Sequence, residues 1–340
     1  MSAETPIRYR AYRNSGGSVS IADEVLLRSR LTGKHEGVVL VRPRFAGICS
    51  ADVRELRGER PGKSDFGHEV VGTVLESTHP GYTTGQHVAL NPFSKVARET
   101  AFAEVMYVAG SFDLLSSALL QVPADRMELS AVEPMACVIH AARQSQVMGS
   151  GPKLVLGAGF FGYLLYCYLE FKGIPVMLAN RTRDRLDHLR KSVEESGAGR
   201  IFFAPEIERY TESFSTVFLT NARLGQEDVS SAVNLVHDHG EVILFGAIDP
   251  ADSALYTTRN QQQRRRWALG SKSYFLQGTL DATPADLHES VEILSQPGFA
   301  RKLTAIFAPP LTFEQGAVHL NQRARSPRSF EKYVVSLSTH

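Results

Sequence analysis

Four residues of this sequence are candidate ligands for a divalent metal ion: Cys49, His68, Glu69 and Glu133. Cys49 and the pair His68-Glu69 lie at the ends of strand-like runs, and Glu133 precedes Pro134 at the start of a helical pattern. Thiolate and imidazole are the ligands that zinc prefers, and a glutamate can provide the third protein contact of a site whose fourth position stays open. The residues therefore suggest a catalytic zinc site. The alternative is a core cysteine and a core histidine with no shared role.

Two carboxylates would act beside these ligands. Asp52 lies three residues after the cysteine, and a carboxylate that accepts a hydrogen bond from a ligating histidine fixes the histidine's tautomer. Glu69 would contact the metal transiently or orient one of its ligands. We therefore predict a catalytic set of Cys49, His68, Glu69 and Asp52.

A glycine-rich turn follows the short apolar run Lys153–Leu156 and opens the apolar helix pattern Tyr163–Phe171. In this strand–turn–helix context, the first glycine permits a tight turn and the second lets a pyrophosphate approach the backbone. The third lets helix and strand pack closely. The free N–H groups of the helix N-terminus favour phosphate. We predict a dinucleotide site at Gly157, Gly159, Phe160, Phe161 and Gly162.

The next predicted strand ends at Asn180 and Arg181, where an acidic residue would be expected to bind the ribose of NAD. Asn180 can hydrogen-bond a hydroxyl group without repelling a phosphate, and Arg181 with Arg185 could pair with a 2′-phosphate. The sequence therefore favours NADP over NAD. The alternative is that Arg181, Arg183 and Arg185 are the exposed first turn of a helix.

The composition is that of a globular protein. The chain has 340 residues with 43% hydrophobic and 21% charged residues, and its net charge of +1 gives no reason to expect nucleic acid or an anionic membrane as partner. The basic run Arg264–Arg266 is interpreted as a solvated turn, with phosphate binding as the alternative. We find no secretory signal or membrane-spanning stretch. Three scattered cysteines favour a reducing cytoplasm.

The order of apolar runs predicts two kinds of architecture. The first part reads as mostly β, with short strands at 37–41, 70–75, 87–90 and 104–108, a turn at Arg60–Ser64 and a helix near 130–146. From Lys153, fully apolar strands alternate with helices, which indicates a parallel sheet buried on both faces. The predicted class is α/β with a β-rich first part.

Several collinear motifs resemble the zinc-dependent medium-chain dehydrogenases/reductases, the alcohol and polyol dehydrogenase superfamily. They are Gly47–Asp52, Gly67–Gly72, Gly85–Val88, Glu133-Pro134 and Gly157–Gly162. The resemblance implies a GroES-like catalytic domain at 1–146, a Rossmann domain at 147–278 and a segment at 279–340 that completes the catalytic domain.

The same resemblance implies a role for particular residues. Zinc would be bound by Cys49, His68 and Glu133, the last directly or through water. Leu244–Gly246, which includes Phe245 and Gly246, and Tyr274–Leu276 would line the nicotinamide pocket, while Lys332 would reach the pyrophosphate. Ala51, Arg54 and Phe93 are expected at the substrate, and relatives of this kind pair into homodimers or homotetramers.

Three departures from the family pattern matter. The segment Asn91–Ala103 has no cysteine, so a second, structural zinc is not expected, and Cys137 and Cys167 are interpreted as core residues. Ala51 stands where relatives carry a hydroxyl that passes on the alcohol proton. Arg54 stands where some relatives have the histidine that ends this relay, and an arginine suits an anionic or polyhydroxylated substrate better.

The predicted activity is hydride transfer between NAD(P) and a secondary alcohol or ketone of a sugar, polyol, cyclitol or aminocyclitol. Arg54, Arg57 and Arg60 favour such a polar substrate. Three alternatives stay open. One is a zinc-free quinone or enoyl reductase. Another is an epimerase or lyase that uses the nicotinamide transiently, and the last is a non-catalytic dinucleotide-binding protein.

Overall fold

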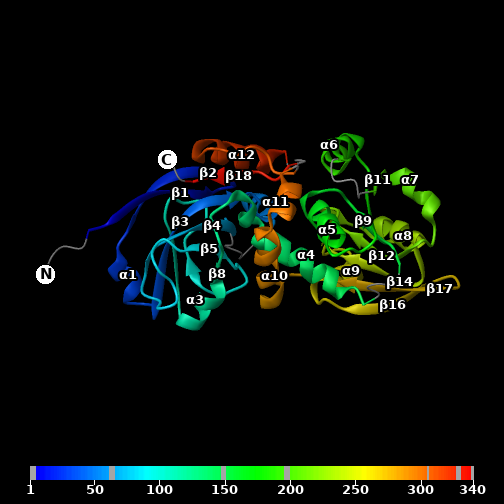
Figure 1. Ribbon diagram of the computed structural model, residues 1–340, viewed down its shortest axis with the longest axis horizontal. Helices are drawn as coiled ribbons and strands as arrows, with labels where there is room; N and C mark the ends of the chain where they lie inside the picture. Colours follow the sequence, from blue (N-terminus) through cyan, green and yellow to red (C-terminus); the bar gives the residue numbers. More distant parts are fainter. Residues whose placement is uncertain are drawn as a thin grey trace. The chain divides into compact units, whose positions relative to one another are not determined.

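The computed structural model describes residues 5–60, 66–146, 151–194, 200–304, 306–326 and 331–337. The chain forms two compact units. The first comprises Met1–Glu133, Ser290–Pro297 and Phe307–His340, and the second comprises Pro134–Glu289 and Gly298–Ile306. Of the turn expected at Arg60–Ser64, only Arg60 lies in the described ranges. Figure 1 labels most of the elements of the two units.

The first unit is built on an antiparallel sheet with the strand order β6-β7-β3-β4-β5-β8, and the C-terminal strand β18 also pairs with β3. The two central strands, β3 and β4, are buried along most of their length and contribute to the core of the unit. The sheet strands are β3 (Gly37–Gly47), β4 (Glu69–Ser77), β5 (His87–Leu90), β6 (Ala97–Arg98), β7 (Met106–Gly110), β8 (Leu119–Gln121) and β18 (Val334–Ser336).

An N-terminal hairpin and a few helices cover this sheet. Strands β1 (Ile7–Ser15) and β2 (Ser18–Leu26) form the antiparallel hairpin. Helix α12 (Phe313–Arg325) presents Phe313, Ala317 and Leu320 to the core that β3 and β4 also fill. The remaining helices are α1 (Arg28–Thr32), α2 (Ser50–Leu56), α3 (Phe112–Ala118) and the 3-10 helix Met127–Ala131.

The second unit is built on a parallel sheet with the order β11-β10-β9-β12-β14-β17-β16, in which only the edge pair β16–β17 is antiparallel. Without β16 this is the 3-2-1-4-5-6 order of a dinucleotide-binding Rossmann sheet. The strands are β9 (Lys153–Leu156), β10 (Val176–Asn180), β11 (Arg200–Phe203), β12 (Phe214–Leu219), β14 (Val236–Leu244), β16 (Arg264–Leu269) and β17 (Lys272–Gly278). The predicted fold class is confirmed.

Helices pack against this sheet: α5 on β9 and β10, α8 on β12 and β14, and α9 on β17. All residues of β12 are buried, as expected for a parallel strand that is covered by helices on both faces of its sheet. The helices and short elements are α5 (Phe160–Phe171), α6 (Arg183–Glu194), α7 (Ala204–Ile207), the 3-10 helix Glu208–Tyr210, β13 (Arg223–Leu224), α8 (Gln226–Leu235), β15 (Ala247–Ile248), α9 (Ser253–Asn260) and α11 (Pro297–Leu303).

The unit boundaries differ from the expected divisions after residues 146 and 278. Helix α4 (Val132–Gln144) belongs almost entirely to the second unit, and α10 (Pro284–Ser295) crosses the boundary after Glu289. Polar contacts explain why α4 stays with the second unit: His140 Nδ1 lies 3.0 Å from an Asp286 oxygen, and Arg143 donates to the other oxygen at 2.5 Å.

The interpretation of Arg264–Arg266 as a turn is wrong. These residues begin the edge strand β16, and Arg264 forms an ion pair with Glu241, which is fully buried. Lys153 is also fully buried and donates to Ser215 Oγ at 2.8 Å. A buried carboxylate is stabilised by a nearby cation. Arg264 provides this cation from the edge strand β16.

In the described part of the chain, no helix combines the length and the hydropathy that a membrane crossing requires.

Candidate functional site

The pairing of β3 with β4 brings the predicted metal-binding residues together. Cys49 follows β3 and caps the N-terminus of α2, while His68 immediately precedes β4 and Glu69 begins it. In the antiparallel register, Gly47 lies opposite Glu69. Two segments that are distant in sequence therefore end at one place in the sheet.

Gly67 allows the chain to turn into this position. Its φ of +65° lies in the left-handed region, and a Cβ there would come within 2.7 Å of Thr100 Oγ1 and 2.9 Å of the Ala101 backbone nitrogen. A residue with a side chain would be strained as well as crowded. The glycine is thus needed to place the histidine that follows it.

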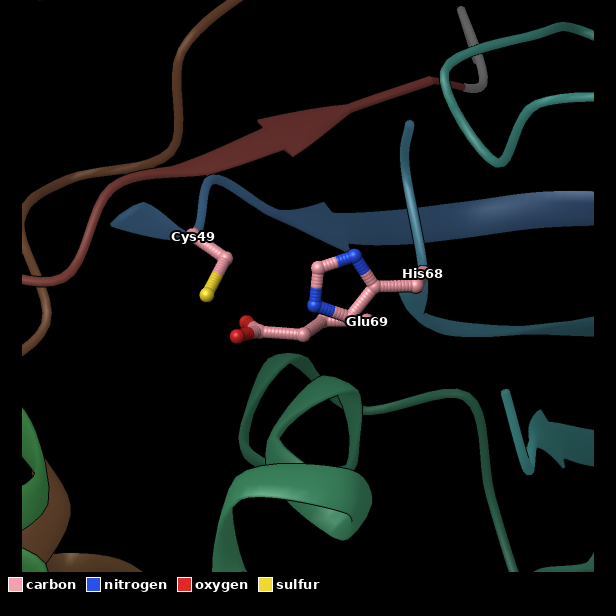
Figure 2. Close-up of side chains that lie close together, drawn as sticks. All are labelled: Cys49, His68 and Glu69. Atoms are coloured by element: carbon pink, nitrogen blue, oxygen red, sulfur yellow. The ribbon is translucent and has the colours of Figure 1, made fainter. Parts of the chain in front are cut away.

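Cys49, His68 and Glu69 form a buried cluster. One ligand atom from each residue lies within 4.8 Å of the other two, and the residues are 7%, 6% and 1% exposed. Figure 2 shows the thiol, the imidazole and the carboxylate turned toward one another. Sulfur, nitrogen and carboxylate oxygen are the donor set that zinc accepts, and the proximity of these donors matches the needs of such an ion.

Asp52 supports this cluster through contacts with Cys49, Gly67 and His68. Its carboxylate accepts hydrogen bonds from the backbone N–H groups of Cys49 (2.8 Å) and Gly67 (2.9 Å), and one oxygen lies 3.5 Å from His68 Nδ1. Nε2 of His68 is then the nitrogen available to a metal. Burial opposes the charged forms, but the attraction between the two groups outweighs it, so the pKa of Asp52 is lowered and that of His68 is raised.

Lys332 lies at the metal-binding cluster. Its Nζ forms an ion pair with Glu69 inside the first unit, and the residue is 4% exposed. Burial would lower the pKa of Lys332, but Glu69 and Cys49 more than compensate and raise it. A Cβ on Gly47 would overlap a Glu69 carboxylate oxygen, so Gly47 leaves room for this pair. The ammonium thus balances charge at the cluster, and its contact with a pyrophosphate stays a prediction.

The other residues predicted at this site lie in different settings. Glu133 is buried, 8% exposed, but does not belong to the metal-binding cluster found among the described residues. Ala51 is half-buried on α2, whereas Arg54 is exposed and lies 3.6 Å from Glu59. Phe93 is half-buried, and its backbone N–H donates to Asn91 Oδ1 at 3.0 Å.

The glycine-rich turn of the second unit has a shape that only glycine permits. Gly157 has φ of +110°, and a Cβ there would lie 2.6 Å from Asn221 Oδ1. A Cβ on Gly162 would overlap the Gly157 carbonyl oxygen. Thr220 Oγ1 donates to that carbonyl at 2.7 Å. The turn therefore keeps the cradle that a dinucleotide needs at the N-terminus of α5.

Asn180 supports this turn directly. Its Oδ1 accepts a hydrogen bond from the Ala158 N–H at 3.1 Å, and its Nδ2 donates to the Thr182 carbonyl at 3.2 Å. The carboxamide predicted to face a ribose hydroxyl is thus already engaged in holding the backbone. Asn180 thus helps to hold the geometry of the turn, and its contact with a cofactor stays a prediction.

The three arginines that follow β10 lie in different settings. Nη1 of Arg185 lies 3.5 Å from the point where a Cβ of Gly159 would stand, and burial lowers the pKa of Arg185. The side chain of Arg181 is 73% exposed and lies 3.8 Å from Asp228. Arg183 instead stacks on Phe203 at 4.1 Å. Arg185 thus lies beside the glycine at which a phosphate would approach.

Two predicted nicotinamide-pocket residues lie at the end of β14 next to the turn. The rings of Phe161 and Phe245 are 5.2 Å apart, and Phe160 contacts Phe161 edge-on at 5.8 Å. A Cβ on Gly246 would overlap the Asn221 carbonyl oxygen. The strand end and the glycine turn therefore share one aromatic cluster.

Comparison with known proteins finds similarity to dehydrogenases. Residues 35–116 match the alcohol dehydrogenase GroES-like domain family. L-galactonate-5-dehydrogenase of Escherichia coli is 22% identical over 286 residues, which cover 76% of this chain and 80% of the relative.

Solved structures agree in fold. Galactitol-1-phosphate dehydrogenase of Escherichia coli aligns with a TM-score of 0.70 at 17% identity, covering 97% of this chain and all of the other. A zinc-binding dehydrogenase of Sinorhizobium meliloti, solved with NADP, aligns with a TM-score of 0.72 at 16% identity, covering 97% and 99%.

The first unit contains the segment that matches the GroES-like family, and the second unit has the strand order of a Rossmann sheet. The chain is thus similar to zinc-type medium-chain dehydrogenases/reductases, by a domain match at residues 35–116 and by distant relatives in sequence and fold.

The sequence interpretation missed three contributions. Thr220 and Asn221 follow the apolar strand β12, and their role depends on β12 lying beside β9. Lys332 reaches Glu69 because β18 returns to β3. Arg323 and His319 of α12 lie in the same unit as the metal-binding cluster. Only the placement of strands by the fold could have indicated them.

Proposed function

We propose that this protein is a zinc-dependent oxidoreductase that transfers a hydride between NAD(P) and a secondary alcohol or ketone of a polar substrate. The convergence of Cys49, His68 and Glu69 within 4.8 Å carries this proposal. A thiol, an imidazole and a carboxylate that are buried together suit one divalent cation better than any role in an apolar core.

The chain's own residues would divide the work. Cys49 and His68 hold the metal, Asp52 keeps the histidine in the required tautomer, and Lys332 balances the charge of Glu69. When bound, zinc supplies Lewis acidity at the substrate oxygen, and the nicotinamide exchanges the hydride. The glycine turn fixes the dinucleotide through backbone N–H groups. Glu133 is the proposed further ligand, directly or through a water molecule.

A sugar, polyol, cyclitol or aminocyclitol is the proposed substrate class. The names of two similar proteins, L-galactonate-5-dehydrogenase and galactitol-1-phosphate dehydrogenase, support a polyhydroxylated substrate. The exposed Arg54 and Arg57 offer charged donors on and after α2. Phe93 and Ala51 are proposed to line the substrate site.

NADP is the proposed preferred cofactor. Arg181 is exposed beyond the end of β10, and Arg185 lies beside Gly159. Replacement of Arg181 with alanine should lower kcat/KM for NADP about tenfold while leaving that for NAD nearly unchanged, because one charge-assisted contact to a 2′-phosphate is lost. Arg183→Ala, which removes a guanidinium stacked on Phe203, is the matched control. A native preference for NAD would overturn this part.

The activity is tested by screening sugars, polyols and cyclitols with both cofactors, following the absorbance of the reduced nicotinamide. One zinc per chain and substrate-dependent reduction of the cofactor are the expected results. A protein that binds a dinucleotide but no zinc would be the non-catalytic alternative.

A second function is favoured by Ala51, which cannot relay a proton. An epimerase or lyase that uses the nicotinamide transiently would convert its substrate with no net change in NAD(P)H. Product analysis beside the absorbance measurement separates it from a dehydrogenase.

The proposed assembly is a homodimer or homotetramer, which sedimentation equilibrium would measure. Strand β16 is the sheet edge of the second unit, and Leu269 at its end is 54% exposed. The proposed location is the cytoplasm, because all three cysteines are free thiols and Cys49 must stay reduced to bind metal.

A further inference from the structure

Helix α12 carries two polar side chains whose buried atoms have no hydrogen-bond partner. They are His319 and Arg323, which lie four residues apart and therefore on one face of the helix. His319 Nε2 and Arg323 Nε are each buried, and neither forms a hydrogen bond with any described residue. The imidazole of His319 packs on the ring of Tyr333 at 3.9 Å.

Such atoms require an explanation because buried polar groups in folded proteins nearly always have partners. Arg323 is half-buried and its guanidinium keeps its charge, so the buried Nε–H calls for an acceptor, for which an anion is best suited. Within the described ranges, no carboxylate forms an ion pair with it. The nearby carboxylate of Asp52 is already engaged by two backbone N–H groups and by His68.

This face of α12 lies close to the metal-binding cluster within the first unit. Helix α12 packs against α2, which begins after Cys49, and against β18. The Tyr333 carbonyl accepts a hydrogen bond from the Ile48 N–H at 2.9 Å. The charges of Cys49, Asp52 and Tyr333 act on the pKa of Arg323, although burial still lowers it.

We propose that Arg323 and His319 form an anion subsite beside the Cys49 cluster, which binds a phosphate group carried by the cofactor or by the substrate. The subsite belongs to the proposed dehydrogenase site and rests on that function. A guanidinium offers phosphate oxygens a planar pair of donors. Burial and the neighbouring Arg323 lower the pKa of His319 to about 4, so its imidazole is neutral at pH 7 and can donate one N–H.

Two probes and a matched pair of variants test the subsite on the zinc-loaded protein. ADP-ribose carries the cofactor pyrophosphate without the nicotinamide, and inorganic phosphate stands for the group alone. Their affinities are measured by calorimetry for the native protein, Arg323→Met and Arg325→Met. Arg325 is exposed two residues further along α12, so its variant makes the same change in charge. We expect Arg323→Met to weaken at least one probe about tenfold or more and Arg325→Met to change both less than twofold.

The source of the phosphate follows from a competition. If Arg323→Met lowers the affinity for ADP-ribose, and if ADP-ribose displaces inorganic phosphate, the cofactor supplies the anion. If phosphate still binds in saturating ADP-ribose and this binding needs Arg323, the substrate supplies it. Equal affinities of native protein and Arg323→Met for both probes would overturn the subsite.

Two further variants separate a lost contact from a lost fold. Arg323→Lys keeps the charge without the planar donors, and His319→Gln keeps a polar side chain. Each should weaken the same probe by a smaller factor than Arg323→Met. Zinc content is measured on all variants, because native zinc with weakened phosphate binding identifies the subsite. A native protein without zinc instead contradicts the proposed function.

Discussion

The two candidate sites of this protein are built in opposite ways. The metal-binding cluster consists of side chains that converge from the ends of β3 and β4. The dinucleotide turn consists of backbone, and what matters at Gly157 and Gly162 is that no Cβ stands there. The first site depends on donors that are present, and the second depends on space that is left open.

This difference decides how each site should fail. Removal of one donor from a cluster of three leaves the neighbouring ligands in place but takes away an essential bond. Addition of one methyl group to the turn shifts the backbone that presents several N–H groups at once. The first kind of change should act on metal content and on the turnover that depends on it, and the second on cofactor affinity and stability together.

The largest effect is expected for Cys49→Ala. Loss of the thiolate should abolish bound zinc and lower turnover at least about a thousandfold, because a Lewis acid contributes several kcal/mol to the barrier. Elemental analysis and steady-state kinetics measure both. Cys137→Ala, which removes a thiol from α4 of the second unit, should keep its zinc. Turnover by zinc-free Cys49→Ala would contradict the metal assignment.

Gly162→Ala tests the opposite kind of site. The new Cβ would overlap the Gly157 carbonyl, so we expect a loss of about 1–3 kcal/mol in the free energy of unfolding. Affinity for NADPH should fall at least about tenfold, measured by fluorescence of the bound cofactor. Gly298→Ala is the control, since a Cβ there meets no atom within 4 Å. Loss of zinc from Gly162→Ala would show that the two sites are not independent.

Asp52→Asn should have an intermediate effect. The substitution keeps the shape but removes the charge that faces His68. Zinc affinity should fall about 10- to 100-fold, the usual cost of losing a carboxylate behind a ligating histidine. Competition with a chelator measures it, with the exposed Asp113→Asn as control. An unchanged affinity would mean that backbone contacts alone hold the histidine.

The smallest effect concerns His319 and pH. The folded pKa of His319 is about 4, below its usual 6.5, so between these values the unfolded chain binds more protons and stability falls as the pH drops. Urea unfolding of native protein and His319→Gln between pH 7 and 4 should show a shallower decline in the variant. The exposed His288→Gln should behave as the native protein does. Parallel curves for all three would contradict the lowered pKa.

Local sequence patterns were enough to predict the glycine-rich dinucleotide turn. The apolar run before Gly157 and the helix after Gly162 are adjacent in sequence, and β9 and α5 form there. The order of apolar strands likewise predicted the parallel sheet. Such features depend on hydrophobic periodicity and backbone freedom, which neighbouring residues determine.

The remaining features depend on contacts between distant segments. The ion pair of Glu69 with Lys332 exists because β18 pairs with β3. Arg264 lies in a strand because Glu241 is buried beside it. The sequence indicated Glu133 and Glu69 as metal-binding residues, but only the fold could show that Glu69 joins Cys49 and His68. The roles of these residues in catalysis stay predictions.

The return of the C-terminal segment to the first unit has a consequence for biosynthesis. A ribosome finishes β3 and β4 long before it makes Lys332 and β18, and the whole second unit is translated in the interval. Until that segment emerges, the edge of β3 that β18 later covers is open and the carboxylate of Glu69 lacks its ammonium partner. The ion pair beside Cys49 is therefore completed only after almost the whole chain has been translated.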